Sequence, residues 1–309
     1  MHRGLGLIVL TALLAACSAG GDPSPFAESR TPPGLAERFY PPEGWAWGFL
    51  QTGDAPAQRY GVAPAGGRVR ADILILPDYG ETAETWFETI HDLAGHGYRV
   101  WVLEAAGQGG SGRLRGPRAV GDVISFDRDI AAVRSMIDVV VRPTPDHPLF
   151  ILAQGAGAII AVPAAAGVSG VHGLVLSAPR LDLERGGPPP PSAAWAGDMK
   201  DAFARGATHD KWRGAVTLTW QKANPDLRMG GPSPRWGRAF QRAIPTARGD
   251  LKNLTVPVVV IEGDRAVGCL GAPRCASVRL AGGDQALELE RDSIRKAWLG
   301  RIDRFVRGL

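Results

Sequence analysis

The sequence predicts an α/β fold in which helices cover both faces of a mostly parallel sheet. Two observations support this fold: the chain contains short, uninterrupted apolar runs, and amphipathic helical segments separate several of them. An uninterrupted apolar run is typical of a strand that is buried on both faces. Strands that alternate with helices usually form a parallel sheet. The five runs are residues 73–76, 100–103, 149–152, 174–176 and 258–261.

The remaining elements follow in chain order. Residues 45–51 and 58–62 predict two antiparallel edge strands before the parallel part of the sheet. Three helices are indicated by apolar residues at helical spacing. Gly95 and Gly97 end the first helix, and Pro143 ends the second. The apolar positions of the three helices are Trp86, Ile90 and Leu93; Phe126, Ile130, Val133, Ile137 and Val140; and Ile294, Trp298, Ile302 and Phe305.

The N-terminus predicts export to a bacterial cell envelope. Residues 1–16 combine a basic start with an apolar stretch that is too short to span a bilayer. The sequence Leu-Ala-Ala-Cys that ends at Cys17 resembles the lipobox of bacterial lipoproteins, in which the cysteine is lipidated. An ordinary secretory signal is the alternative. Ser18 follows the cysteine, and a residue other than aspartate there favours the outer membrane, with the protein facing the periplasm.

Beyond the signal peptide, composition divides the chain into a tether, a core and an insertion. Residues 17–40 are rich in small residues and proline and predict a flexible tether. Residues 183–245 open with a proline-rich stretch, contain several tryptophans and show no clear strand, so we expect an inserted helical cap. A loop that packs on the surface is the alternative. The core is then made of residues 41–182 and 246–309.

Cysteine count and charge narrow the class of protein further. With Cys17 lipidated, Cys269 and Cys275 remain as a pair, and we expect a disulfide between them in an oxidising compartment. The formal charge of the chain is +4. The basic residues form no block, and no stripe of them is interleaved with aromatic residues. We therefore expect no nucleic-acid partner. No histidine lies near the cysteine pair, and the sequence indicates no metal or other cofactor.

Several stretches resemble a known family. They are "ILILPDYGETAETWFETIHDLAGHGYRVWVLEAAGQGGSGR" at residues 73–113, "LVLSAP" at 174–179 and "ANPDLRMGGPSPRW" at 223–236. Together they resemble the bacterial lysophospholipase and monoacylglycerol-lipase branch of the α/β-hydrolases. The resemblance implies an α/β-hydrolase fold with a helical cap. It also implies ester hydrolysis by a serine, an aspartate and a histidine in that chain order.

The residues at the catalytic positions of this family depart from its pattern. The nucleophile turn, normally G-x-S-x-G, reads Ala-Gln-Gly-Ala-Gly, so Gly155 stands at the serine position. Gln285 stands at the position of the histidine, and an amide cannot take a proton near neutral pH. Asp264 aligns with the acid, although the loop before it is shortened. Its alternative role is structural, as the cap of a turn or the partner of Arg265.

The segments that supply the oxyanion-binding N–H groups in this family are altered as well. The family's His-Gly pair aligns with Pro77-Asp78, but the backbone N–H groups of Tyr79 and Ala156 remain available to converge on an anion. A carboxylate at Asp78 would oppose such an anion.

These departures predict a catalytically inactive lipoprotein with a hydrolase fold, whose capped pocket binds an acyl or lipid-like ligand or a protein partner. An active carboxylic-ester hydrolase with a rearranged site and a purely structural envelope protein are the alternatives. If the first prediction is right, Gly155→Ser alone should be nearly inert. Gly155→Ser together with Gln285→His should gain at most slow activity, because the members of a triad act as a unit.

Overall fold

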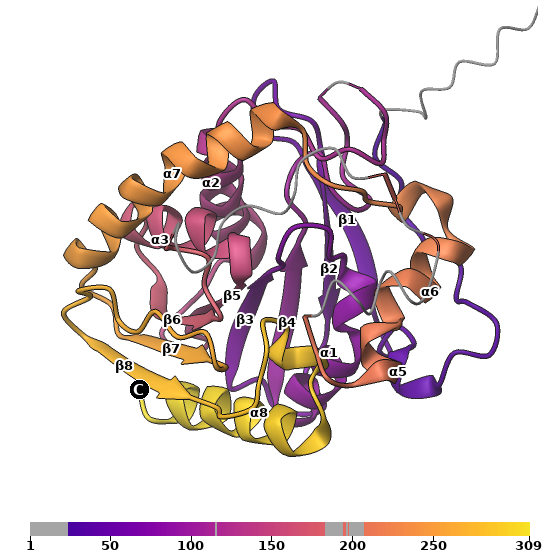
Figure 1. Ribbon diagram of the computed structural model, residues 1–309. Helices are drawn as coiled ribbons and strands as arrows, with labels where there is room; N and C mark the ends of the chain where they lie inside the picture. The colour runs from indigo at the N-terminus through magenta and orange to yellow at the C-terminus, as the bar shows by residue number, and fades with distance from the viewer. Residues whose placement is uncertain (1–23, 115, 183–193, 196, 198–206) are drawn as a thin grey trace, which may run out of the picture.

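The structure is a computed structural model that describes residues 24–114, 116–182, 194–195, 197 and 207–309. Its centre is an eight-stranded sheet in the order β1-β2-β4-β3-β5-β6-β7-β8 (Figure 1). β2 runs antiparallel to both of its neighbours, and all other pairings are parallel. The strands are β1 Ala46–Leu50, β2 Gln58–Ala63, β3 Ala71–Leu76, β4 Tyr98–Leu103, β5 Leu149–Gln154, β6 Val171–Ser177, β7 Val258–Glu262 and β8 Cys275–Arg279.

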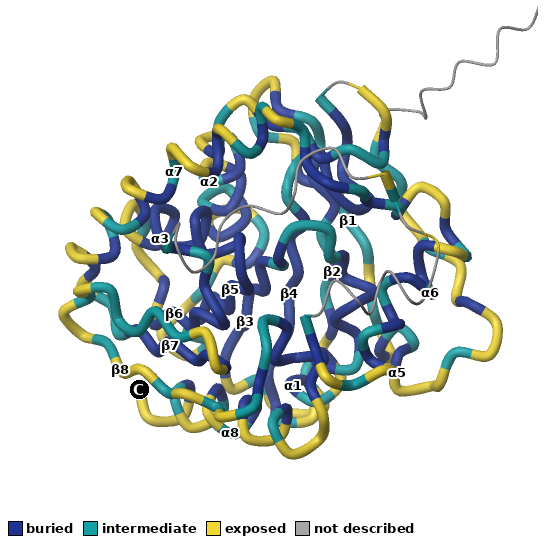
Figure 2. The backbone as a smooth tube through the Cα atoms, in the orientation of Figure 1, coloured by how far each residue is buried: buried dark blue, intermediate teal, exposed yellow. Residues whose placement is uncertain are grey.

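Helices cover both faces of the sheet, and each face has its own apolar core. One core packs the sheet against α2 Asp127–Ser135, α3 Ala158–Ala166 and α7 Pro234–Asn253. The other packs it against α1 Phe87–Gly95 and α8 Asp292–Arg307, with Trp86 and Trp298 fully buried. The inner strands β3 to β7 lie dark and buried between the two layers (Figure 2). Short 3-10 helices are η1 Glu37–Phe39, η2 Ala83–Trp86, η4 Gly155–Gly157, η5 Pro225–Leu227 and η6 Leu287–Leu289.

The sequence-based prediction of the fold is confirmed, with local differences. All five apolar runs are buried strands, and the two N-terminal strands pair antiparallel, although β2 lies inside the sheet rather than at its edge. The second helix changes after Ser135 into a π-helical segment, η3 Met136–Val141, and ends at left-handed Arg142. Strand β8 was not predicted. Its mostly exposed residues give no apolar pattern, since it forms the outer edge of the sheet.

Most of the described residues of the predicted cap lie in its second half. There the chain forms α5 Lys211–Gly214 and α6 Val216–Ala223, and no strand occurs among the described residues of 183–245. The predicted boundary at residue 245 falls inside α7. This helix belongs to the core, because its buried residues, including Trp236 and Phe240, pack in the same apolar cluster as α2 and α3.

The predicted tether contacts the core and the cap within its described residues, 24–40. Phe26 N donates to Gly110 O at 3.0 Å, and the Arg59 guanidinium lies over the Phe26 ring at 4.9 Å. Further along, Arg30 N donates to the side-chain oxygen of Asn224 at 2.7 Å. The small residues of this segment do not prevent it from packing, because the core and the cap satisfy its backbone groups.

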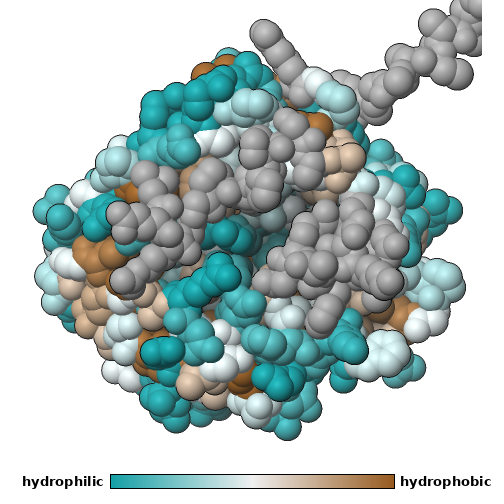
Figure 3. Space-filling model, viewed as in Figure 1, coloured by the Kyte–Doolittle hydropathy of each residue, from teal (hydrophilic) through white to brown (hydrophobic). Residues whose placement is uncertain are grey.

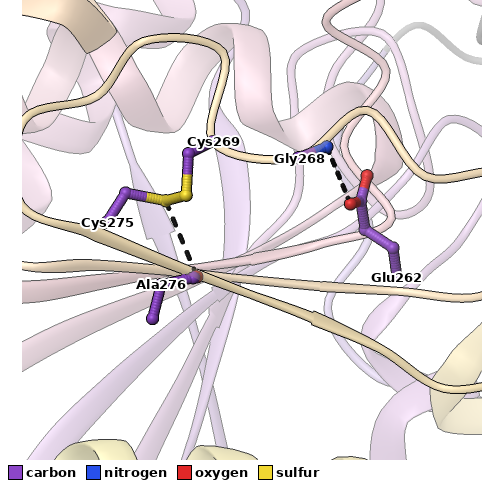
Figure 4. The surroundings of a disulfide bond; sticks show 5 residues. All are labelled: Glu262, Gly268, Cys269, Cys275 and Ala276. Carbon is purple, nitrogen blue, oxygen red and sulfur yellow. Dashed lines mark hydrogen bonds between the residues drawn. A yellow bond between two sulfur atoms is a disulfide. The ribbon is translucent and has the colours of Figure 1, made fainter.

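The predicted disulfide between Cys269 and Cys275 is confirmed (Figure 4). It ties the loop after β7 to the first residue of β8. Glu262, the last residue of β7, is buried and accepts hydrogen bonds from Val267 N at 2.7 Å and Gly268 N at 2.9 Å. The loop is thus held by a carboxylate at one end and by the disulfide at the other. In the described part of the chain, no helix is both long and apolar enough to cross a membrane.

Candidate functional site

The candidate site lies where β3 and β5 end side by side. These strands are parallel neighbours, so the turns that follow them meet at the same edge of the sheet. β3 is followed by Pro77-Asp78-Tyr79, and β5 is followed by the sharp turn at Gly155 that begins η4 and α3. The turn at Gly155 and the Pro77-Asp78-Tyr79 loop therefore lie side by side.

Gly155 is required by both conformation and space. Its φ is +51°, in the left-handed region that other residues adopt only with strain. A Cβ atom at this position would overlap the carboxyl group of Asp78. The volume that a nucleophilic side chain needs is therefore filled by a carboxylate from the neighbouring loop.

The Asp78 carboxylate also occupies the two backbone donors of the oxyanion side. Its Oδ1 atom accepts from Tyr79 N at 2.8 Å and from Ala156 N at 2.7 Å. The two amides thus converge on one atom. The expectation that Asp78 merely opposes an anion is too weak, because Asp78 itself is the bound anion. An oxyanion of a substrate cannot use these donors while Asp78 holds them.

Arg180 completes this arrangement and was not anticipated from the sequence. Its Nε atom donates to Asp78 Oδ2 at 3.0 Å, and its backbone N–H donates to the carbonyl of Gly155 at 3.0 Å. The charge of Asp78 raises the pKa of Arg180 above its ordinary value. A single arginine after a buried strand carries no recognisable signal, so only the folded structure could identify it as the partner of Asp78.

Gln285 acts as a structural bridge at the histidine position. Its Nε2 atom donates to the carbonyl of Ala178 at 2.6 Å, and its own carbonyl accepts from Gln154 Nε2 at 2.6 Å. Gln154 directly precedes Gly155, so the base position and the nucleophile position are adjacent, as in the alignment. Gln285 thus links the ends of β5 and β6, because its backbone carbonyl accepts from Gln154 and its side-chain amide donates to Ala178.

The Asp264 carboxylate bonds to Gly282 and Arg279. It is exposed and accepts from Gly282 N at 3.2 Å and from Arg279 Nη2 at 3.1 Å. The Gly282 amide and then the Arg279 guanidinium lower the pKa of Asp264 below its ordinary value. The suggested pairing with Arg265 is wrong as to the partner, which is Arg279. The structural role is otherwise supported, since the carboxylate caps a turn.

Ser111 and Ser177 have structural roles. Ser111 is buried, accepts from Arg59 N at 2.9 Å and donates to Glu104 O at 3.1 Å. Ser177, at the end of β6, accepts from Trp298 Nε1 at 3.0 Å. Each hydroxyl is used inside the core and lacks an imidazole partner among its described contacts.

Two further carboxyl groups lie beside Asp78. Glu81 Oε2 accepts from Asp78 N and from Trp86 Nε1, both at 3.0 Å. Burial, followed by the charge of Asp78, raises the pKa of Glu81 from 4.5 to about 7. Burial and the charge of Glu81 also raise the pKa of Glu288, whose two carboxyl oxygens have no hydrogen-bond partner among the described residues. The site is therefore rich in carboxyl groups, and the raised pKa values of Glu81 and Glu288 favour their uncharged forms beside Asp78.

The raised pKa of Glu81 predicts how its contribution to stability depends on pH. The folded protein holds this proton more tightly than the unfolded chain, so the contribution is fully present below about pH 4 and is lost as pH rises through about 7. Glu81→Gln keeps an oxygen for both donors but cannot ionise. We expect the free energy of unfolding of the variant, relative to wild type, to rise by on the order of 3 kcal/mol between pH 4 and pH 8. Urea unfolding at several pH values measures this, and a pH-independent difference would contradict it.

In the cap, His209 is held by a buried acid. Its Nδ1 atom lies 2.6 Å from Glu290 Oε1, which also accepts from Asp284 N at 3.1 Å. The contact joins the start of the described cap to the loop that carries Gln285. Ala286 N strengthens this junction by donating to Ala207 O at 2.7 Å.

The sheet order, the strand-to-helix turn after β5 and the two convergent amides define the α/β-hydrolase class. A family model described as "Serine aminopeptidase, S33" matches residues 67–275, more than half of the chain. The chain belongs to this family.

Individual relatives agree with this assignment. The chain is 26% identical over 192 residues to lysophospholipase L2 of Escherichia coli strain K12, covering 54% of this chain and 55% of the relative. It thus spans about half the length of that curated relative. Among solved structures, it is similar to a soluble variant of monoglyceride lipase from Saccharomyces cerevisiae, with a TM-score of 0.65 at 16% identity over 84% of this chain and 94% of that one. A carboxyl esterase from Bacillus coagulans gives a TM-score of 0.61 at 14% identity, covering 85% and 98%.

Proposed function

We propose that this chain is a lipid-anchored, non-catalytic member of its family that serves the cell envelope by binding an acyl or lipid-like ligand or a protein partner. One observation carries the proposal: the Asp78 carboxylate is bound by the Tyr79 and Ala156 amides and fills the space of a nucleophile at Gly155. A site whose oxyanion donors are already occupied by an internal anion cannot stabilise the tetrahedral intermediate of acyl transfer.

The catalytic positions support the same conclusion. Gly155 has no side chain, Gln285 cannot act as a base, and Asp264 is exposed and paired with Arg279. These defects are independent of each other, since they lie on separate loops after β5, β7 and β8. An enzyme of this family needs all of these groups to act together.

An ester hydrolase with a rearranged site is the second candidate. It is favoured by the His209–Glu290 pair, in which an imidazole is held by a buried carboxylate. Such a pair orients a base, but the base still needs a hydroxyl or thiol within hydrogen-bond reach. A fluorophosphonate probe separates the two candidates, because it labels an activated serine wherever that serine lies.

We expect purified protein to show no turnover of short-chain nitrophenyl esters above the buffer rate and no fluorophosphonate labelling. His209→Ala should leave both readouts unchanged. Specific labelling of one serine that is lost in His209→Ala would overturn the proposal in favour of the second candidate. Native mass spectrometry of the same preparation tests the binding role, since a co-purified lipid supports it. A chain free of any ligand, with its pocket filled by side chains, would instead favour a structural envelope protein.

The membrane anchor is a separate part of the proposal. Cys17 lies outside the described residues, and its support is the lipobox-like sequence that precedes it. We expect Cys17→Ser to abolish acylation, measured by incorporation of labelled palmitate, and to block cleavage after residue 16. Ser18→Ala is the matched control and should be acylated normally. Acylation that persists in Cys17→Ser would contradict the proposed anchor.

A further inference from the structure

The solvent side of α7 carries an unbalanced set of cations. Arg238, Arg242 and Lys252 are exposed and Arg248 is half-buried, whereas Asp250 is the one acidic residue of the helix. We call these four cations the α7 basic face. None of them forms an ion pair within the described part of the chain. Exposed positions run along the outer side of α7 and buried ones face α3 (Figure 2), and hydrophilic residues cover much of this upper left edge (Figure 3).

Apolar side chains adjoin the first half of this face. Ile124 is 53% exposed, and its carbonyl accepts a long hydrogen bond, 3.5 Å, from Arg242. An open groove beside the start of α7 is lined by Pro117, Val120 and Pro234 together with Arg238. Cations beside exposed apolar residues are the combination that binds a membrane interface, where headgroups meet acyl chains.

The described chain begins on the same side of the molecule. The carbonyl of Ser24 accepts from Arg118 Nη1 at 2.8 Å. The segment that follows Arg118 is bonded to the start of α7, because Ser233 N donates to Gly121 O at 2.8 Å. Cys17 precedes Ser24 by seven residues, and a chain of that length reaches at most about 25 Å. A lipid on Cys17 would therefore keep this end of α7 close to the bilayer.

We propose that the α7 basic face docks on the anionic headgroups of the membrane that holds the lipid anchor. This inference rests on the proposed anchoring for its biological setting, but the electrostatic contact itself is independent of the lipid. A cation near an anionic surface raises the affinity about five-fold. Docking would fix the orientation of the domain, so that α7 faces the bilayer and α8, on the opposite face of the sheet, faces away.

The test uses residues 17–309 carrying Cys17→Ser, a chain that contains every element of the fold but cannot be acylated. Its sedimentation is measured with vesicles of pure phosphatidylcholine and with vesicles containing one-third phosphatidylglycerol. We expect binding to the anionic vesicles only, weakened by added salt. The triple variant Arg238→Glu, Arg242→Glu, Lys252→Glu should lose about 100-fold or more in affinity.

The matched control carries Lys296→Glu, Arg301→Glu and Arg304→Glu, the same charge change at exposed positions of α8. It should bind within about three-fold of the parent chain if contact is confined to α7. A milder variant, Arg238→Gln with Arg242→Gln, should lose about 25-fold in affinity for the anionic vesicles. This variant keeps the test valid if the triple variant misfolds. Equal losses on α7 and α8, or no binding to anionic vesicles, would overturn the docking proposal. Neither result bears on Cys17, whose acylation is measured separately.

Discussion

Gly155→Ala is expected to destabilise the protein by considerably more than the same change at Gly282. Both glycines have positive φ, +51° and +75°, so both variants incur backbone strain of about 1–3 kcal/mol. A Cβ at Gly282 meets open space, whereas a Cβ at Gly155 overlaps the Asp78 carboxyl group. Forcing extra volume into a packed site adds about 1–3 kcal/mol. Urea unfolding of the two variants measures the difference, and equal losses would show that Asp78 moves aside freely.

A second substitution tests whether Asp78 causes the larger destabilisation expected for Gly155→Ala than for Gly282→Ala. Asp78→Ala removes the atoms that a Cβ at Gly155 would meet, so Gly155→Ala should cost less in that background. The double-mutant cycle should give a coupling of about 1–3 kcal/mol. The same cycle between Gly282→Ala and Asp78→Ala should give a coupling near zero. A serine at residue 155 meets the same overlap, so the combination with Gln285→His lacks both space and an open oxyanion site unless Asp78 is also replaced.

The second large effect is the loss of stability expected when Asp78 is replaced. Asp78→Ala deprives the Tyr79 and Ala156 amides and the Arg180 guanidinium of their shared anion. Removing one member of a largely buried ion pair costs about 3–5 kcal/mol, and the 22% exposure of the Arg180 side chain places the expected loss at the lower end. We expect added formate to restore part of this stability, by about 1.4 kcal/mol at ten times its Kd.

The control for formate rescue is Asp78→Asn, which keeps an oxygen for the two amides and fills the same volume. Its stability should not respond to formate beyond the response of wild type. Chloride at equal ionic strength is the control for screening, since a carboxylate matches two amides and a guanidinium better than a spherical ion does. Identical melting curves of Asp78→Ala in formate and chloride would show that the donors do not form an anion site.

The sequence was sufficient where a pattern reflects burial. The apolar runs of β3 to β7 are buried on both faces, and this is why continuous hydrophobicity identified them. Edge strand β8 has no such constraint and was missed. The helical spacing of α7 was hidden within a tryptophan-rich insertion, so its membership of the core became clear only from its packing.

At the site, the sequence predicted which residues stand at the catalytic positions but not how their side chains are oriented. Alignment assigned Gly155, Gln285 and the two amides to positions in the family pattern, because backbone position follows from the order of strands and turns. It could not show that the Asp78 side chain turns back onto its own loop, or that Arg180 meets it from the end of β6. Side-chain rotamers and ion pairs between distant segments depend on the assembled structure. For the same reason, the raised pKa of Glu81 had no counterpart in the sequence pattern.

The carboxylate of Asp78 has a consequence for the history of this chain. A lineage that regained a serine at residue 155 first would meet the overlap with Asp78, and one that lost Asp78 first would leave Arg180 without its bonded anion. Each single step toward an active enzyme thus lowers stability before any activity returns, and natural proteins have little stability to lose. Under the proposed non-catalytic function, selection can refine what the scaffold binds, but a return to catalysis requires more than one mutation at a time.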